Sequence, residues 1–249
     1  VINQSWVDIQ NKLWLSNLDG LNSNDISLLY RLERFSLDED YVHFYLTNTN
    51  YKDAFGTNIS HPELATIYGV NFLANPLAIC GLIFSSDEKI LLFHRSSRVL
   101  DRPDFWHTIG GHLIRPKKRS FEEKYIFDET EIVNALSEEI QEELKGFDTN
   151  TIKYLPLCFI RDTNTQKNEL CYLVHSQSTV ESIVQNLNLN FEHNHDYKIL
   201  PLDLEIIGKF LSENYSRIVP STKASLYHFC LLHFGEERSR YLLERIGKE

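Results

Sequence analysis

The clearest periodic pattern lies between residues 132 and 144, where apolar side chains recur at every fourth position. They are Ile132, Leu136, Ile140 and Leu144. This spacing predicts an amphipathic helix with one buried stripe. With a rotation of roughly 100° per residue, Glu139, Glu142 and Glu143 fall within an arc of about 100° beside that stripe, and Glu143 lies inside the apolar sector. The pattern therefore predicts a helix that gathers three carboxylates at the edge of its buried face.

Longer apolar runs, separated by short polar segments, predict the strands of a sheet. Residues 76–84 and 90–95 form two such runs, and the polar stretch 85–89 between them is typical of a hairpin turn. Further strands are expected at 106–109, 154–162, 169–174 and 198–202. Because Gly110–Gly111 follows the short strand at 106–109, we expect that strand to deliver the glycine pair to the start of the acidic helix.

The remaining segments predict helices and polar loops. Helices are expected at 179–187, 204–214 and 221–246, the last one beginning after Pro220. In the N-terminal part, Asn24–Asp25 predict a capped helix over 26–32, and residues 41–46 have strand composition. Polar loops are expected at 49–58 and 191–196.

The acidic helix face favours a metal site. Carboxylates held together on a half-buried face repel one another and lose hydration, and a hard divalent cation with oxygen ligands would compensate for both costs. The glycine pair adds to this interpretation, because glycine lets a backbone carbonyl approach a ligand closely. The alternative is a solvated acidic face, which is the usual setting of a charge run. The position of Glu143 on the buried side favours the metal.

Charge and cysteine content narrow the class of partner. The formal net charge of −10 argues against nucleic acid as the main partner, and an acidic protein that acts on a phosphate ester needs a bound cation. The four cysteines form no C-x-x-C pair, which argues against zinc and for reduced thiols. No apolar run reaches membrane-spanning length and the start carries no signal-peptide pattern, so we expect a cytoplasmic protein without a membrane partner.

Two segments carry candidate binding residues. The segment 49–58 offers an aromatic ring that could stack on a base and polar groups that could read its edge, although an ordinary surface connection has the same composition. Arg95 and Arg98 follow the strand at 90–95 and suit a bidentate grip on phosphate, or else solvated charge at the strand end. From the residues alone, both alternatives stay open in each case.

The glycine and helix segments resemble the Nudix box, in which a glycine precedes the pattern Arg-Glu-apolar-x-Glu-Glu-x-Gly-apolar. The matching positions are Gly111, Glu139, Glu142 and Glu143. Three features depart from the box: Glu138 stands at the arginine position, Lys145 stands at the closing glycine position, and a basic insert around 115–119 lengthens the path from the glycine to the helix.

A wider set of segments is similar to one Nudix branch, the UDP-glucose/UDP-galactose diphosphatases of animals. The similar segments are 51–58, 73–77, 95–98, 110–112, 139–143, the surroundings of Glu192, and 220–224. That branch also carries a long insert after its glycines and lacks the box arginine, so two of the departures become points of agreement. The resemblance covers roughly residues 45–230.

The resemblance implies an α/β fold, namely a Nudix-type α/β/α sandwich with a mixed sheet. The catalytic domain would comprise residues 73–249, and an N-terminal extension at 1–72 would pack on the core and contribute to substrate recognition. The implied reaction is Mg²⁺-dependent hydrolysis of the pyrophosphate bond of a UDP-sugar to UMP and a sugar 1-phosphate, with Mn²⁺ as an alternative metal. The implied partner is this small-molecule nucleotide-sugar, and the oligomeric state is not indicated.

The same resemblance assigns roles to individual residues. Metal binding falls to Gly111, Glu139, Glu142 and Glu143, and catalysis to the three glutamates together with Glu192. Substrate binding falls to Tyr51, Asp53, Phe55, Asn58, Arg95 and Arg98. Glu169 and Asp196 are alternatives to Glu192 as the general base. Two other functions stay open: hydrolysis of a different nucleoside diphosphate derivative such as ADP-ribose, and nucleotide binding without catalysis.

Overall fold

The computed structural model describes residues 28–39, 41–114, 129–144, 147–185, 187, 193–243 and 246, and the chain divides into two compact units. Unit 1 comprises the described parts of Val1–Ala78, His112–Phe127 and Arg161–Asn168. Unit 2 comprises those of Ile79–Gly111, Asp128–Ile160 and Glu169–Glu249. The domain boundary expected between residues 72 and 73 stays a prediction.

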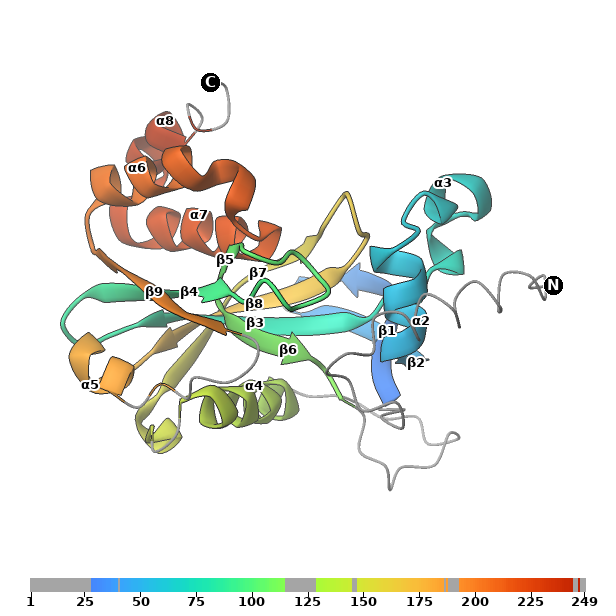
Figure 1. Cartoon of the computed structure of the whole chain (residues 1–249), viewed down its shortest axis with the longest axis horizontal. Coiled ribbons are helices and arrows are strands. Elements are labelled where there is room, and N and C mark those ends of the chain that lie inside the picture. The colour runs from blue at the N-terminus through green and yellow to red at the C-terminus, as the bar shows by residue number, and fades with distance from the viewer. Residues whose placement is uncertain are drawn as a thin grey trace. The chain divides into compact units, whose positions relative to one another are not determined.

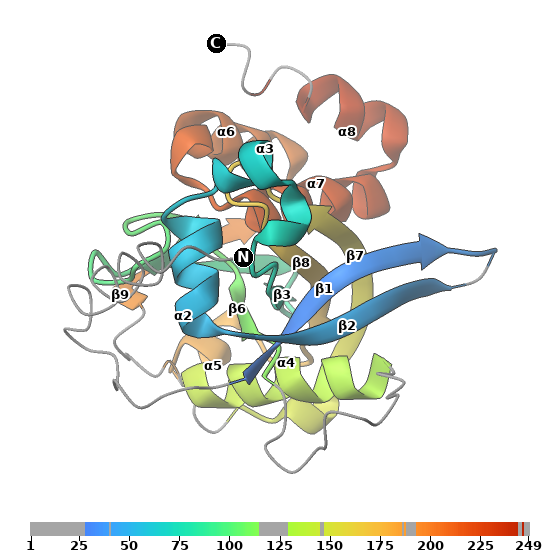
Figure 2. The same cartoon turned by 90° about the vertical axis from the view of Figure 1, so that its right-hand side faces the viewer.

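Unit 1 is built on a β-hairpin followed by short helices. Its elements are β1 (Leu28–Leu37), β2 (Val42–Asn50), α2 (Tyr51–Ala54), the π-helix η1 (Phe55–Ile59), α3 (Leu64–Tyr68) and the 3₁₀-helix η2 (Val70–Phe72). β1 and β2 pair antiparallel as a two-stranded sheet, and Figure 2 shows the two strands side by side. The strand expected at 41–46 is confirmed as β2.

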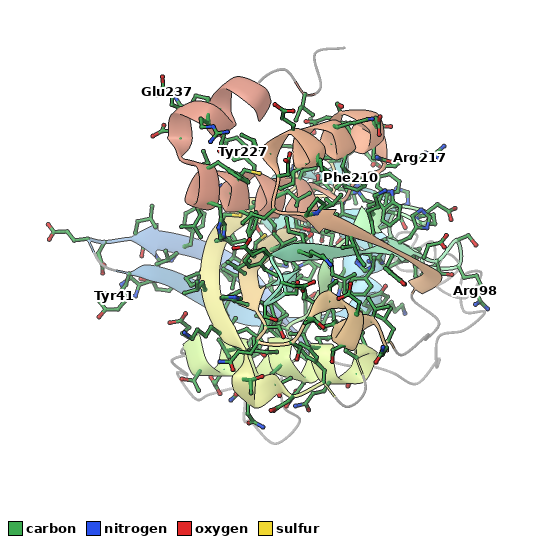
Figure 3. The ribbon with its side chains drawn as sticks, turned by 90° about the vertical axis from the view of Figure 1, so that its left-hand side faces the viewer. Tyr41, Arg98, Phe210, Arg217, Tyr227 and Glu237 are labelled. Atoms are coloured by element: carbon green, nitrogen blue, oxygen red, sulfur yellow. The ribbon has the colours of Figure 1, made fainter. Side chains whose placement is uncertain are left out.

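The helix expected over 26–32 is wrong in its described part, which belongs to β1. The backbone N–H of Tyr30 donates to the carbonyl of Leu113 at 3.0 Å, and that of Leu32 donates to the carbonyl of Asn75 at 3.0 Å. These long-range bonds, together with the pairing to β2, outweigh the local capping signal. Past Leu32 the hairpin becomes exposed, and Figure 3 shows the side chain of Tyr41 pointing away from its tip.

Unit 2 contains most of a seven-stranded mixed sheet. Its strands are β3 (Leu77–Phe84), β4 (Lys89–Arg95), β5 (Trp106–His107), β6 (Ile109–His112), β7 (Lys153–Arg161), β8 (Asn168–His175) and β9 (His193–Pro201). The strand order is β5-β4-β3-β8-β7, with β6 paired to β3 and β9 paired to β4. The strands expected from apolar runs are confirmed, including the β3–β4 hairpin around the polar turn at 85–89. One is corrected: the single strand expected at 106–109 is divided at Thr108 into β5 and β6, and the glycine pair lies within β6.

The helices of unit 2 cover both faces of its sheet. They are α4 (Glu129–Glu143), the 3₁₀-helix η3 (Thr149–Thr151), α5 (Val180–Gln185), α6 (Leu204–Asn214), the 3₁₀-helix η4 (Tyr215–Arg217), α7 (Pro220–Phe234) and α8 (Glu236–Leu243). Figures 1 and 2 show α6 and α7 on one side of the sheet and α4 on the other. This arrangement confirms the predicted α/β sandwich with a mixed sheet.

Neighbouring residues of β3 illustrate how the two layers pack. Leu82 is fully buried in a cluster with Ile207 of α6 and Phe229 of α7. Successive side chains of a strand point to opposite faces, so Gly81 faces the other layer. A Cβ on Gly81 would lie 2.5 Å from Val174 Cγ2 and 3.4 Å from Leu136 Cδ1, which shows how closely α4 approaches the sheet.

Three other expectations from the sequence are corrected. The segment 49–58 is the end of β2 followed by α2 and η1, where a loop was expected. Likewise β9 begins at His193, because its backbone pairs with β4 up to Arg95, so the described part of the loop expected at 191–196 is strand. The single helix expected over 221–246 is divided into α7 and α8 by Gly235, whose φ of +81° is incompatible with a continuing helix. Among the described residues, no helix is long and apolar enough to cross a membrane.

Candidate active site

The carboxylate of Glu139 lies against the backbone of Gly111, and both residues belong to unit 2. A Cβ built on Gly111 would lie 2.2 Å from Glu139 Oε1 and 2.6 Å from its carboxyl carbon. A side chain at position 111 would therefore have to displace the Glu139 carboxylate, which is the end of a flexible side chain, from this contact. Figure 1 shows the elements concerned, with α4 running beside β6.

The preceding glycine is required for a different reason. A Cβ on Gly110 would lie 2.2 Å from the carbonyl oxygen of Ile79 and 2.7 Å from Cys80 Cα. The pair thus lets β6 press against β3 on one side and receive a glutamate of α4 on the other. The two glycines singled out by sequence therefore have separate structural roles in the same strand, β6.

The apolar stripe of α4 is buried as predicted, and so is Glu143. Ile132, Leu136 and Ile140 are buried in α4, and Glu143 is only 5% exposed. Glu139 is half-buried, whereas Glu142 and Glu138 are exposed. Because residues four apart share a helix face, Glu139 and Glu143 lie one turn apart on the same side of α4. One face of α4 therefore carries a buried carboxylate, Glu143, and a half-buried carboxylate, Glu139, that lies against Gly111.

No three histidine, cysteine, aspartate or glutamate side chains of the described residues lie close enough together to hold a metal ion. The contact on this face joins the Glu139 carboxylate, an oxygen donor, to the backbone of Gly111. Mg²⁺ commonly takes one or two protein carboxylates and completes its shell with water and substrate phosphate. The Glu139 carboxylate therefore suits a hard divalent cation, and metal binding by Gly111, Glu142 and Glu143 stays a prediction.

The two candidate phosphate-binding arginines lie at and just after the end of β4: Arg95 is its last residue, and Arg98 follows it in the chain. Arg95 is half-buried, its backbone N–H donates to the carbonyl of Phe105 at 2.8 Å, and it pairs with His193 of β9. Arg98 is exposed, and its backbone N–H donates to Ser96 Oγ at 3.2 Å. Figure 3 shows the Arg98 side chain pointing away from the ribbon. Their role in holding phosphate stays a prediction.

The expected recognition segment forms the start of a helix in unit 1. Asn50 caps α2: its Oδ1 accepts from the Asp53 backbone N–H at 2.9 Å, and its Nδ2 donates to Asp53 Oδ2 at 2.7 Å. The ring of Tyr51 meets the ring of His112 edge to face, with centroids 5.6 Å apart. Tyr51 and Asp53 are half-buried, and their contact with a substrate stays a prediction.

Phe55 and Asn58, expected to contact substrate, are buried inside unit 1. Phe55 is 6% exposed and Asn58 is fully buried. The Asn58 Nδ2 donates to the Thr165 carbonyl at 2.9 Å, and its Oδ1 accepts from the Asn75 backbone N–H at 3.0 Å. Both side chains are therefore packed inside unit 1, and their contact with a substrate stays a prediction.

The predicted general base, Glu192, lies outside the described residues, so its role stays a prediction. Of its two alternatives, Glu169 is 6% exposed in β8, and Asp196 is exposed in β9.

Sequence reasoning did not identify the contact that positions the strand leading to the glycines. The backbone N–H of Thr108 donates to Thr222 Oγ1 at 3.0 Å, and both residues are buried. Thr222 belongs to the first turn of α7, directly after Pro220 and Ser221. The sequence offered only the hydroxyl residues that follow Pro220 at the start of the helix, and nothing in it indicated that Thr222 would bind Thr108.

Comparison with known proteins yields weak structural similarities. The chain matches no protein-family model and no curated protein sequence. A bifunctional NMN adenylyltransferase/ADP ribose pyrophosphatase from Francisella tularensis is similar with a TM-score of 0.44 and 15% identity, over 72% of this chain and 46% of that one. This chain therefore spans about half the length of that structure.

Two smaller proteins give comparable scores. A MutT protein from Methanosarcina mazei has a TM-score of 0.39 and 16% identity, covering 70% of this chain and 96% of that one. A NUDIX hydrolase from Nitrosomonas europaea has a TM-score of 0.38 and 14% identity, covering 62% and 87%. At scores this low, the similarities assign neither a family nor an activity to the chain.

Proposed function

We propose that the protein is a Mg²⁺-dependent hydrolase of the Nudix type that cleaves the pyrophosphate bond of a UDP-sugar, UDP-glucose or UDP-galactose, to give UMP and a sugar 1-phosphate. One observation carries the proposal: the Glu139 carboxylate lies against Gly111, with Glu143 buried one turn along the same helix face. The sequence resemblance to UDP-sugar diphosphatases supplies the substrate class.

The reaction adds water across one phosphoanhydride bond. The water oxygen bonds to one phosphorus, the bond from that phosphorus to the bridging oxygen breaks, and the bridging oxygen leaves with the other phosphate. Negative charge accumulates on the bridging and equatorial oxygens as this happens. When bound, Mg²⁺ would offset that charge and make an attacking water more acidic.

Residues of unit 2 would bind the cation, bind the phosphates and accept the proton of the attacking water. Glu139 and the backbone of Gly111 would hold the cation, with Glu142 and Glu143 as further carboxylates of the same helix. The guanidinium groups of Arg95 and Arg98 suit the phosphates, because each offers several N–H donors in a planar fork. A carboxylate outside α4, for which Glu192 is the first choice, would accept the proton of the attacking water.

The test is to incubate the purified chain with UDP-glucose or UDP-galactose and Mg²⁺ and to measure UMP and sugar 1-phosphate. We expect turnover that stops when the metal is chelated. Glu139→Gln and Glu143→Gln should lower kcat/KM by roughly 10²-fold or more. Glu138→Gln is the matched control, because it makes the same change on an exposed neighbour and should leave kcat/KM unchanged.

Two results would contradict the proposal in different ways. Turnover of ADP-ribose without turnover of either UDP-sugar would support pyrophosphate hydrolysis but contradict the proposed substrate. Equal activity of Glu138→Gln and Glu139→Gln would contradict the proposed role of Glu139 in the active site.

A second candidate function is nucleotide binding without hydrolysis, which is favoured by the lack of a three-carboxylate cluster among the described residues. Under this alternative, UDP-glucose would bind the wild type and the Glu142→Gln variant equally well in calorimetry, with and without Mg²⁺. No UMP would be released from either.

A further inference from the structure

Three of the four cysteines lie on three adjacent strands of unit 2. Cys80 is in β3, Cys171 in β8 and Cys158 in β7, and the sheet order places β8 between the other two. Cys80 and Cys171 are buried, whereas Cys158 is half-buried. The sequence shows the three thiols as scattered, with 78, 91 and 13 residues separating the pairs 80/158, 80/171 and 158/171.

Continuing the β7–β8 pairing from the turn that joins these two neighbouring strands places Cys158 opposite Cys171. The strands are joined by the short turn 162–167, where the Asp162 backbone N–H donates to the Lys167 carbonyl at 2.9 Å. Next along the ladder, Arg161 Nε donates to Asn168 Oδ1 at 2.8 Å. Cys158 lies three residues before Arg161 in β7, and Cys171 lies three residues after Asn168 in β8. The two cysteines are therefore opposite each other in the same register.

Opposed residues of antiparallel strands share a face of the sheet, with Cα atoms about 4.5 or 5.5 Å apart. Disulfides need a Cα separation of about 4.4–6.8 Å. The Cα separation expected for the two opposed cysteines therefore lies within the range that a disulfide requires, without any change of register.

The two thiols have unequal chemistry. A hydrogen bond with Cys171 lowers the pKa of the Cys158 thiol, against the opposing effect of burial. Hydrogen bonding with Cys158 and Cys80, together with burial, holds the pKa of Cys171 well above its ordinary value. Cys171 also donates from Sγ to the Ser221 carbonyl at 3.9 Å. Because Cys158 is half-buried and Cys171 is buried, Cys158 is the thiol that a partner from solvent can reach first.

We propose that Cys158 and Cys171 form a reversible intramolecular disulfide by exchange with a small-molecule disulfide such as oxidised glutathione. The Cys158 thiolate attacks one sulfur of the oxidised glutathione, the S–S bond breaks, and one glutathione leaves as thiolate. Cys171 then loses its proton to solvent and attacks the Cys158 sulfur of the mixed disulfide, which releases the second glutathione. Two protein thiols are oxidised and one glutathione disulfide is reduced, so the exchange balances.

The fourth cysteine provides an internal control. Cys230 is fully buried in α7, and burial raises the pKa of its thiol to about 12. It is not part of the row of three strands and should stay reduced throughout.

The test is to incubate the full-length chain with oxidised glutathione, quench with acid, and count thiols under denaturing conditions before peptide mapping. We expect the count to fall from four to two, with a single cross-link between the peptides of Cys158 and Cys171, and to return to four with dithiothreitol. The exchange should be faster at higher pH, because Cys171 must ionise.

Variants separate the two steps. Cys158→Ser should keep all three of its remaining thiols, Cys171→Ser should retain one glutathione on Cys158, and Cys230→Ser should lose the same two thiols as the wild type. A cross-link that contains Cys80, a wild-type product that stays glutathionylated, or no loss of thiols would each overturn the proposal. The wild-type peptide map decides the question even where a buried Cys171→Ser variant does not fold.

Discussion

The backbone N–H of Thr108 donates a hydrogen bond to the hydroxyl of Thr222, 3.0 Å away, although 114 residues separate the two along the chain. Thr108 lies between β5 and β6, directly before the strand that carries Gly110 and Gly111, and Thr222 lies in the first turn of α7. The position of β6, the strand that carries the glycine pair, therefore depends on how α7 packs against the sheet.

Removing the Thr222 hydroxyl should destabilise the fold. Thr222→Val keeps the shape of the side chain but leaves the Thr108 N–H buried without an acceptor, because Thr108 is only 3% exposed. The expected loss is roughly 1–3 kcal/mol in the free energy of unfolding, measured by urea denaturation. Thr222→Ser retains the hydroxyl and should lose clearly less. Equal losses in the two variants would show that the methyl group, and not the hydrogen bond, matters.

A side chain at position 111 should displace the Glu139 carboxylate. Gly111→Ala places a Cβ where this carboxylate lies, and because the carboxylate is the end of a flexible side chain that can turn away, we expect only a small loss in the free energy of unfolding. In a Glu139→Ala background the same substitution should cost less, and urea denaturation of the four proteins of this cycle measures the coupling. Additive effects would mean that the two residues do not touch. Under the proposed function, Gly111→Ala alone should also lower kcat/KM by roughly 10²-fold.

Asn58 should matter for stability. Asn58→Leu would leave the Thr165 carbonyl and the buried Asn75 N–H without their partners, at roughly 1–3 kcal/mol for each unpaired group. Asn58→Asp keeps the acceptor for Asn75 but buries a carboxylate against the Thr165 carbonyl, so it should also destabilise the fold, and more so when the carboxyl is ionised. If Asn58→Leu unfolds at the wild-type urea concentration yet weakens UDP-glucose binding, the residue acts on substrate as the sequence suggested.

Asp87 should make the fold sensitive to acid. Its Oδ1 accepts from the Val180 N–H at 2.8 Å at the start of α5, and its Oδ2 lies 2.8 Å from Lys89 Nζ. Burial acts to raise the pKa of Asp87, but hydrogen bonds from Lys89, Ser85 and Val180 together hold it well below its ordinary value.

A carboxyl with a lowered pKa in the folded state stabilises the fold above its unfolded pKa of about 3.9 and loses this contribution as the pH falls. Asp87→Asn should therefore reduce the thermal unfolding temperature at neutral pH and flatten its decline below about pH 4. Glu205→Gln, on an exposed position of α6, should track the wild type at every pH. If the unfolding temperatures of all three proteins fall in parallel as the pH is lowered, the Asp87 carboxyl does not cause the acid sensitivity.

The spacing of apolar residues was sufficient to predict those helices and strands whose structure depends mainly on their own residues. The four-residue spacing of apolar side chains identified α4 and the buried position of Glu143, and continuous apolar runs identified β3, β4 and β8. These features follow from the 3.6-residue helix turn and the two-residue strand repeat, which are properties of the sequence itself.

Elements with weak local signals were predicted less well. The capping residues Asn24–Asp25 suggested a helix, yet residues from Leu28 onward form β1 because the backbone finds partners in β2, Leu113 and Asn75. The polar composition of 49–58 suggested a surface loop, yet Asn58 is buried because its amide satisfies two distant backbone groups.

The sequence by itself determined that the chain forms an α/β sandwich and that one helix carries carboxylates beside its apolar stripe. Only the tertiary structure decided that Glu139 meets Gly111, that Thr222 holds Thr108, and that Cys158 faces Cys171. Each of these pairs joins different elements, and the distance between two elements depends on how whole layers pack. A repeat read along a single segment contains no information about that packing.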